Sequence, residues 1–358
     1  MKKSIALVLS LFLMLSFVLA GCSDSKSSSP SETLLKSIEK AADIKSYSLS
    51  GSLAIKDLNL PEEVLAEEGA SQAVAMLQNA ELSWSGAYRA DPMLIELTLK
   101  ISLSGDLAMS FQIPLIMNQD KMWIKVPNIP MLELPEDIVG KFIEFDLKKL
   151  AEEQGTEWPG TMDINKSMEF GKEIYGVIFK NIDEKTYLSS PSVKDAGIPE
   201  GKDVKKVVQL HVTKDQFEPF VNAVVEKIGP QVLDLIAGKQ EYLDMAQLTK
   251  EDIEDAKKEL ADVDSTDVKE AMDEFNKVVK SFDITSNMGI NKDGYTTYTD
   301  MTIKANIEDE GQSGGGTISM VSEQSDINGD PKFEYGEPKA EDVISMDELS
   351  EVLGGLYF

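Results

Sequence analysis

The chain is poor in the residues on which most catalytic and metal sites depend. Its 358 residues include one cysteine, Cys22, one histidine, His211, and one arginine, Arg89. A single cysteine excludes an intramolecular disulfide, so apolar burial must stabilise the fold. A single histidine excludes zinc sites built on several histidines. His211 lies between Leu210 and Val212, in the polar register of a predicted strand, which indicates a surface residue and not a proton shuttle.

Motifs for nucleotide or metal chemistry are also scarce. No G-x-G-x-x-G or phosphate loop stands at a predicted strand–helix junction. The segment Asp326–Asp330 is similar to part of a calcium loop, and Glu337 occupies the twelfth position, but the required glycine is missing and Pro331 follows, so a turn is the better interpretation. The sequence therefore predicts no enzyme, no cofactor and no metal. An envelope hydrolase with paired carboxylates stays open as an alternative, because acidic pairs can meet in space.

Basic residues are few relative to acidic ones. The chain has 35 Lys+Arg against 63 Asp+Glu, a net charge of −28. This charge argues against nucleic acid as a partner and against flat adsorption onto anionic lipid. With 42% hydrophobic residues the chain can still build a core, so the charge indicates a solvated surface.

The N-terminus carries an export signal. Lys2 and Lys3 precede an apolar run over Ile5–Ala20, and Leu19-Ala20-Gly21-Cys22 follows. This arrangement resembles a bacterial lipoprotein signal with its lipobox. The resemblance implies that residues 1–21 are removed, that a diacylglyceryl group is attached to Cys22, and that the protein is held at the extracytoplasmic face of the cell membrane. Residues 22–31 would be a flexible tether. The alternative is a plain transmembrane anchor, for which the apolar run is short.

Most of the remaining chain alternates with a period of two. In the clearest segment six apolar residues share one register: Met93, Ile95, Leu97, Leu99, Ile101 and Leu103. Strict alternation is typical of antiparallel strands with one buried and one wet face. Trp123 falls in the polar register of its strand, and the pattern leaves open whether it is covered.

Several helices interrupt the strands. The spacing predicts helices over 32–42, 164–182, 249–260 and 267–280, and a capping box from Thr213 to Gln216 before another helix. It also predicts a helical insertion over 61–77 with Val64, Leu65 and Met76 inward. Asn291–Gly294 predicts a hairpin turn. The predicted fold class is α+β: one domain over 32–358, with a large curved antiparallel sheet and helices on its apolar face.

A few segments resemble a known group. They are the serine-alternating strand from Lys45 to Leu53, the segments 121–127 and 142–150, and the motifs at 325–331 and 338–342. Together they look like Gram-positive envelope lipoproteins related to the LolA/LolB and LppX carriers. The resemblance implies a half-barrel whose concave apolar face is closed by helices and holds acyl chains. RseB-like regulators share that fold and sense envelope stress. The insertions at 61–77 and 249–280 depart from the plain carriers.

Two functions follow as hypotheses. In the first, a hydrophobic ligand, lipid or acyl, binds between sheet and helices, against a lining of Trp84, Leu97, Leu99, Ile101, Met109, Phe111, Ile284, Met288 and Met301. In the second, the protein is an interaction or sensory module with a packed core, whose acidic surface attracts a basic protein partner. A carrier needs a void of roughly 300–1,000 Å³, whereas a scaffold does not.

Overall fold

The structure is a computed structural model of the chain, and it describes residues 28–66, 69–104, 108–129, 134–153, 164–263, 265–346 and 348–349. The signal, Cys22 and most of the tether lie outside these residues. Strands and helices are both abundant, which confirms the α+β class. Among the described residues no helix is both long and apolar enough to cross a membrane.

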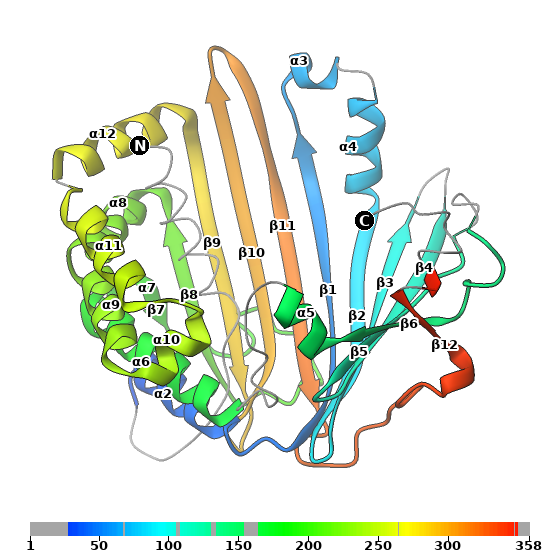
Figure 1. The fold of residues 1–358 in the computed structure, drawn as a ribbon. Coiled ribbons are helices and arrows are strands. Elements are labelled where there is room, and N and C mark those ends of the chain that lie inside the picture. The colour runs from blue at the N-terminus through cyan, green and yellow to red at the C-terminus, as the bar shows by residue number, and fades with distance from the viewer. Residues whose placement is uncertain are drawn as a thin grey trace. The chain divides into compact units, whose positions relative to one another are not determined.

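Twelve strands form a large, mostly antiparallel sheet. In sequence order they are β1 (Ser46–Asn59), β2 (Ala80–Ala90), β3 (Met93–Leu103), β4 (Met109–Met117), β5 (Lys121–Lys125), β6 (Phe142–Asp146), β7 (Leu188–Ser189), β8 (Lys206–Thr213), β9 (Val279–Ile290), β10 (Thr296–Asp309), β11 (Gln312–Ser325) and β12 (Val343–Ser345). The hydrogen-bonded order is β12-β6-β5-β4-β3-β2-β1-β11-β10-β9-β8-β7 (Figure 1). Strand β12 runs parallel to β6.

The helices fall into three stretches of the chain. The first holds α2 (Pro30–Ala41), and the second holds α3 (Glu62–Leu65), α4 (Ala70–Gln78) and, after β6, α5 (Leu147–Glu153). The third holds α6 (Ile164–Asn181), α7 (Glu184–Tyr187), α8 (Lys214–Ala223), the π-helix η1 (Val224–Ile228), α9 (Gly229–Gly238), α10 (Gln240–Ala246), α11 (Lys250–Ala261) and α12 (Ser265–Val278). A short 3₁₀ turn, η2 (Ala340–Asp342), precedes β12.

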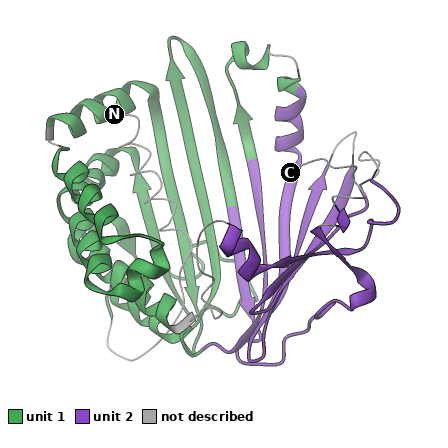
Figure 2. Ribbon diagram, viewed as in Figure 1, with its two compact units in different colours: residues 1–43, 56–71, 164–319 green, residues 44–55, 72–163, 320–358 purple. Residues whose placement is uncertain are grey.

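The chain divides into two compact units. Unit 1 comprises residues 1–43, 56–71 and 164–319, and unit 2 comprises 44–55, 72–163 and 320–358 (Figure 2). Strands β1 and β11 contribute residues to both. Whether the whole segment 32–358 behaves as one domain stays a prediction.

In unit 1 the helices pack on the apolar side of β8 and β9. The largest core cluster joins Val212 of β8 and Ile284 of β9 to Ile38 of α2, Tyr175 of α6 and Ile253 of α11, all at most 6% exposed. A second cluster joins Met288 to Leu34, Leu188, Val208 and Ile290. Apolar burial of this kind contributes about 25 cal/mol per Å², so these clusters supply the stability that no disulfide provides.

Most predicted local elements are present, and some boundaries differ. Helix α2 begins at Pro30, two residues inside the predicted tether, and the Ser29 side chain caps it by accepting from the Glu32 N–H at 3.2 Å. The capping box of Thr213 and Gln216 opens α8 as predicted. The Asn291–Gly294 turn joins β9 to β10, with Gly294 at a φ of 88°.

The orientation expected for the insertion over 61–77 is wrong. Its described parts form α3 and α4, but Val64 is 40% exposed and Met76 is 38% exposed, and Leu65 is only partly buried. Neither helix contains a buried residue. The pattern misled because alanine and methionine suit a helix whether or not its face is covered.

Candidate hydrophobic binding face

Strands β2 to β5 of unit 2 carry an uncharged apolar face. The register pairs Trp84 with Leu99 and Leu99 with Ile113, and it pairs Leu97 with Leu115 and Leu115 with Ile124. Residues that are partners across strands lie on the same side of a sheet. The apolar face so defined consists of Leu82, Trp84, Met93, Ile95, Leu97, Leu99, Ile101, Leu103, Met109, Phe111, Ile113, Leu115, Met117, Met122 and Ile124.

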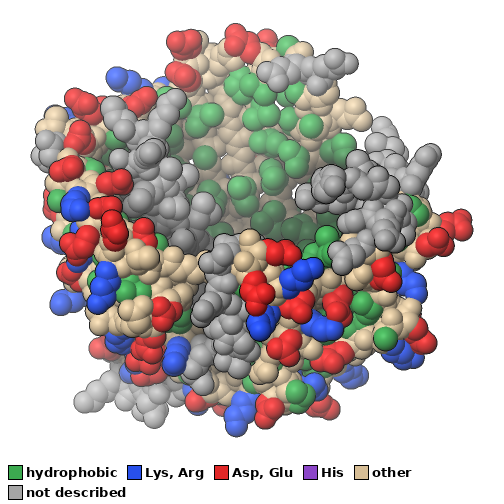
Figure 3. All heavy atoms as spheres, viewed as in Figure 1, with side chains coloured by type: hydrophobic (Ala, Val, Ile, Leu, Met, Phe, Trp, Pro, Cys, Tyr) green, Lys and Arg blue, Asp and Glu red, His purple; other side chains and the backbone are tan. Residues whose placement is uncertain are grey.

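This apolar face is only partly buried. Ile95, Leu97, Leu99, Ile101 and Leu103 of β3 are all intermediate in exposure, whereas Leu94 and Glu96 in the opposite register are buried. The face extends about 27 Å along β3 and about 14 Å across the four strands, a footprint on the order of 400 Å². This footprint is comparable to the largest apolar patch on a typical monomer, and such patches are often functional. Figure 3 shows hydrophobic side chains gathered over the strands of the sheet.

Two glycines let the strands approach closely within this register. A Cβ atom at Gly86 would lie 2.0 Å from the backbone oxygen of Glu96, and one at Gly51 would lie 2.4 Å from Cζ2 of Trp84. The Trp84 ring therefore lies over the bare backbone of Gly51. Glycine in a strand commonly marks a tight bend of this kind, so both positions fit a curved sheet in unit 2.

Tyr47 and Tyr88 continue the register at one end of the face. Their ring centroids are 5.2 Å apart, and Tyr88 pairs with Ile95 on β3. Burial raises the pKa of both phenols above the usual value. Both groups are neutral at pH 7, so a ligand on this face meets no charge from them.

The other side of the same strands is covered by the C-terminal segment of residues 331–339, called the strap below. Phe333 and Tyr335 of the strap pack against a buried cluster of Leu94, Ile116, Trp123 and Phe142. Trp123 is 4% exposed, and its indole N–H donates to Glu144 at 2.9 Å. Trp123 is therefore a covered core residue, despite its polar register.

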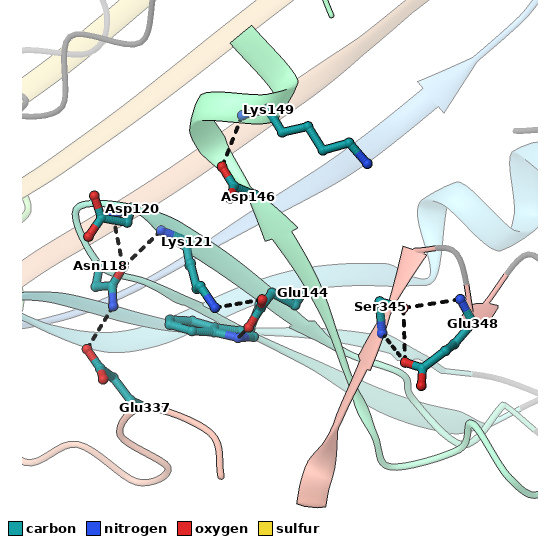
Figure 4. A network of polar contacts seen from close by, with 10 residues as sticks. Asn118, Asp120, Lys121, Glu144, Asp146, Lys149, Glu337, Ser345 and Glu348 are labelled. Carbon is teal, nitrogen blue, oxygen red and sulfur yellow. Dashed lines mark hydrogen bonds and ion pairs between the residues drawn. The ribbon is translucent and has the colours of Figure 1, made fainter. Parts of the chain in front are cut away.

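Glu96 anchors the strap. The backbone N–H groups of Glu334, Tyr335 and Gly336 donate to its carboxylate at 2.7, 2.9 and 3.0 Å. A second anchor is the Asn118 amide, which donates to Glu337 at 2.8 Å (Figure 4). Among the described residues, the strap thus covers the Glu96 side of these strands, whereas the opposite, apolar side of β3 is only partly buried.

The structure brings together six of the nine predicted lining residues. Trp84, Leu97, Leu99, Ile101, Met109 and Phe111 all lie on the apolar face of unit 2. The other three belong to unit 1. Ile284 and Met288 are 4% and 3% exposed within its packed core, and Met301 is half-buried on β10. The predicted lining left out the other residues of this face, among them Ile95, Ile113 and Leu115, although their alternation was equally visible.

The remaining chemical candidates show no reactive arrangement. His211 is half-exposed, with Nε2 2.8 Å from an Asp283 oxygen. Residues 326–329 form a turn in which the Gly329 N–H donates to the Asp326 carbonyl, as the turn interpretation predicted. Among the described residues no group of three or more His, Cys, Asp or Glu is placed to hold a metal ion.

Unit 1 also has a surface depression of about 410 Å³ between the end of α6, α7, α8 and η1. Its charged lining residues are Asp183, Asp215, Glu226 and Lys227. Carboxylates thus outnumber the single ammonium group, and the depression would attract positive charge.

Comparison with known proteins adds no assignment. No family model matches the chain, and no curated protein sequence matches it.

Proposed function

We propose that this protein is a membrane-anchored, extracytoplasmic lipoprotein that binds a hydrophobic ligand, a lipid or an acyl chain, and catalyses no reaction. The observation that carries this proposal is the inverted burial of β3, where Leu97, Leu99 and Ile101 stay partly exposed while Glu96 is buried. Leaving aliphatic side chains in water costs about 25 cal/mol per Å². A ligand that covers the face recovers this free energy.

The chemistry of the face sets the kind of ligand. The apolar face contains no charged side chain and no aliphatic hydroxyl, and Trp84 offers only a single N–H. A charged headgroup placed against it would lose hydration without gaining a partner. We therefore propose that a hydrocarbon chain contacts the face while any polar group stays at its edge.

The finer architecture belongs to the same proposal. A half-barrel with helices closing a concave apolar face would enclose such a chain. The close approaches at Gly51 and Gly86 support curvature in unit 2. The packing of α2, α6 and α11 on β8 and β9 supports helix coverage within unit 1.

The anchor is proposed from the N-terminal signal alone. A diacylglyceryl group on Cys22 would hold the chain at the membrane, because each buried methylene contributes about 0.8 kcal/mol. Removal of Lys2 and Lys3 with the signal leaves 33 Lys+Arg against 63 Asp+Glu, a net charge of −30. The lipid, and not the protein surface, would then provide the attachment.

Lipid extraction and mass spectrometry test the ligand directly. The mature chain from residue 23, which contains every described residue, is purified without detergent, denatured and extracted. We expect co-purified lipid near one equivalent, and at least a tenfold loss in Leu99→Asp, since a buried carboxylate opposes hydrocarbon. Lys100→Asp is the matched control, because Lys100 is exposed on the other side of β3. Lipid-free parent protein, or equal loss in both variants, would contradict the proposal.

A second function, recognition of a basic protein partner, is favoured by the acidic depression in unit 1. A lysine-rich peptide should bind there at low salt and lose affinity in the combined variant Asp183→Asn, Asp215→Asn, Glu226→Gln. Neutralising three exposed carboxylates of α11, Glu254, Asp255 and Glu259, provides a control of equal charge. Equal weakening in both variants would show a net-charge effect and no defined site.

A further inference from the structure

Among the described residues, half of strand β4 has one edge without a partner strand. On one side, β4 pairs with β3 along its whole length, from Met109 with Leu103 to Met117 with Ile95. On the other side, β5 pairs only with the last three residues, Leu115 to Met117. Within the described chain no strand pairs with residues 109–113 on that side. Such edges recruit further strands unless charge, proline or a bulge protects them.

The hydrogen-bonding groups at this edge can be assigned from the hairpin. The Asn118 N–H donates to the Lys121 carbonyl at 3.0 Å, so the even-numbered residues of β4 direct their backbone groups toward β5. Orientation alternates along an antiparallel strand, and the register with β3 has no shift. Ser110 and Gln112 therefore present both N–H and C=O outward. Pro114 has the same orientation but lacks an N–H.

The exposed backbone groups of β4 can pair with those of a second copy of β4 when Phe111 lies at the centre of the pairing. If two copies of β4 run antiparallel with Phe111 opposite Phe111, then Ser110 of each copy faces Gln112 of the other, and four backbone hydrogen bonds form. A register centred on Gln112 would place Ser110 opposite Pro114 and lose a donor. A register centred on Ser110 would need Ala108, which lies before the strand. No residue from 109 to 114 is charged, so nothing repels a second copy along the edge.

We propose that this protein forms a symmetric dimer by antiparallel pairing of two β4 edges about Phe111. The pairing joins the apolar faces of two unit 2 sheets into a wider one and places two Phe111 rings at the twofold axis, where directly opposed aromatic residues stabilise a sheet. A five-residue edge is smaller than a standard interface, so the expected Kd is roughly 10 µM to 1 mM. The chain from residue 23, without Lys2 and Lys3, has a net charge of −30, so the affinity should rise with salt.

Cysteine cross-linking tests the register. The chain from residue 23 contains no cysteine, so a single introduced thiol can form only an intermolecular disulfide. In Phe111→Cys the two Cα atoms would be about 4.5 Å apart, within disulfide range. Gln112→Cys is the control, because Gln112 faces Ser110 and not itself. Rapid cross-linking of Phe111→Cys alone supports the dimer. Equal cross-linking of both variants, or of neither, would overturn it.

Sedimentation measures the association without a thiol. The parent chain should show a monomer–dimer equilibrium that Gln112→Pro weakens at least tenfold, because proline removes an outward donor that β3 does not use. Gln112→Thr keeps the N–H and should dimerise like the parent. A parent that stays monomeric up to about 1 mM would refute the proposal. Binding of extended peptides to the β4 edge without any self-association of the chain would also refute it.

Discussion

Removing the Glu96 carboxylate should release the strap from the sheet. Glu96 is 4% exposed and accepts three backbone hydrogen bonds from residues 334–336. In Glu96→Ala those three donors lose their partner, and each buried unpaired donor costs about 1–3 kcal/mol. Since part of the strap can rehydrate, we expect a loss of about 3–5 kcal/mol in the free energy of unfolding. Glu96→Gln keeps one acceptor oxygen and should lose about 1–3 kcal/mol.

The assay is urea unfolding, monitored by the fluorescence of Trp123, which the strap covers. Trp84 and Trp158 are replaced by phenylalanine in all variants, so that Trp123 is the only fluorescent tryptophan. Hydrogen exchange at the amides of residues 334–336 is measured in parallel. Glu81→Ala is the matched control, because Glu81 is exposed on the same side of the sheet as Glu96. The reasoning is refuted if Glu96→Ala costs less than about 1 kcal/mol while those amides remain protected.

Two other substitutions test the fold by different physics. Gly86→Ala should lower the free energy of unfolding by about 3 kcal/mol, because its Cβ would lie 2.0 Å from the Glu96 backbone oxygen. Gly176→Ala, in open space on α6, should raise it by about 0.5–1 kcal/mol. Thermal or urea unfolding measures both, and a Gly86→Ala variant as stable as the parent would disprove the close approach. Burial raises the pKa of Asp300 above its usual value, so its ionisation opposes folding as the pH rises through the unfolded-state pKa of about 3.9. Asp300→Asn should therefore be more stable than the parent at pH 7, with a difference that disappears below about pH 4; a difference constant with pH would contradict the shift.

Features decided within a few residues were predictable from the sequence. The capping box at Thr213 and Gln216 and the turn at Asn291–Gly294 need only neighbours three residues apart, so composition specifies them. The alternation of β3 likewise placed Leu97, Leu99 and Ile101 on one side of a sheet. Six of the nine residues expected to line a ligand site share a face for this reason.

The alternation of apolar and polar residues did not show which of the two sides of each strand would be buried by other elements. In β3 the apolar side stays partly exposed, and the side with Glu96 is buried by a strap more than 230 residues further along the chain. In β9 the apolar side is packed, since Ile284 and Met288 meet helices of unit 1. Both strands show the same period of two. The difference comes from long-range partners, and the aromatic pair Phe333 and Tyr335 was the only local sign of the strap.

Ligand-dependent quenching of Trp84 tests the central claim most directly. Two versions of the mature chain, each with a single tryptophan at position 84 or position 123, are titrated with brominated oleic acid, because bromine quenches indole fluorescence only at contact distance. Trp84 lies on the apolar face and Trp123 is 4% exposed beneath the strap. The account predicts saturable quenching of Trp84 and none of Trp123. Unquenched Trp84, or equal quenching of both, would contradict a hydrophobic ligand site on this face.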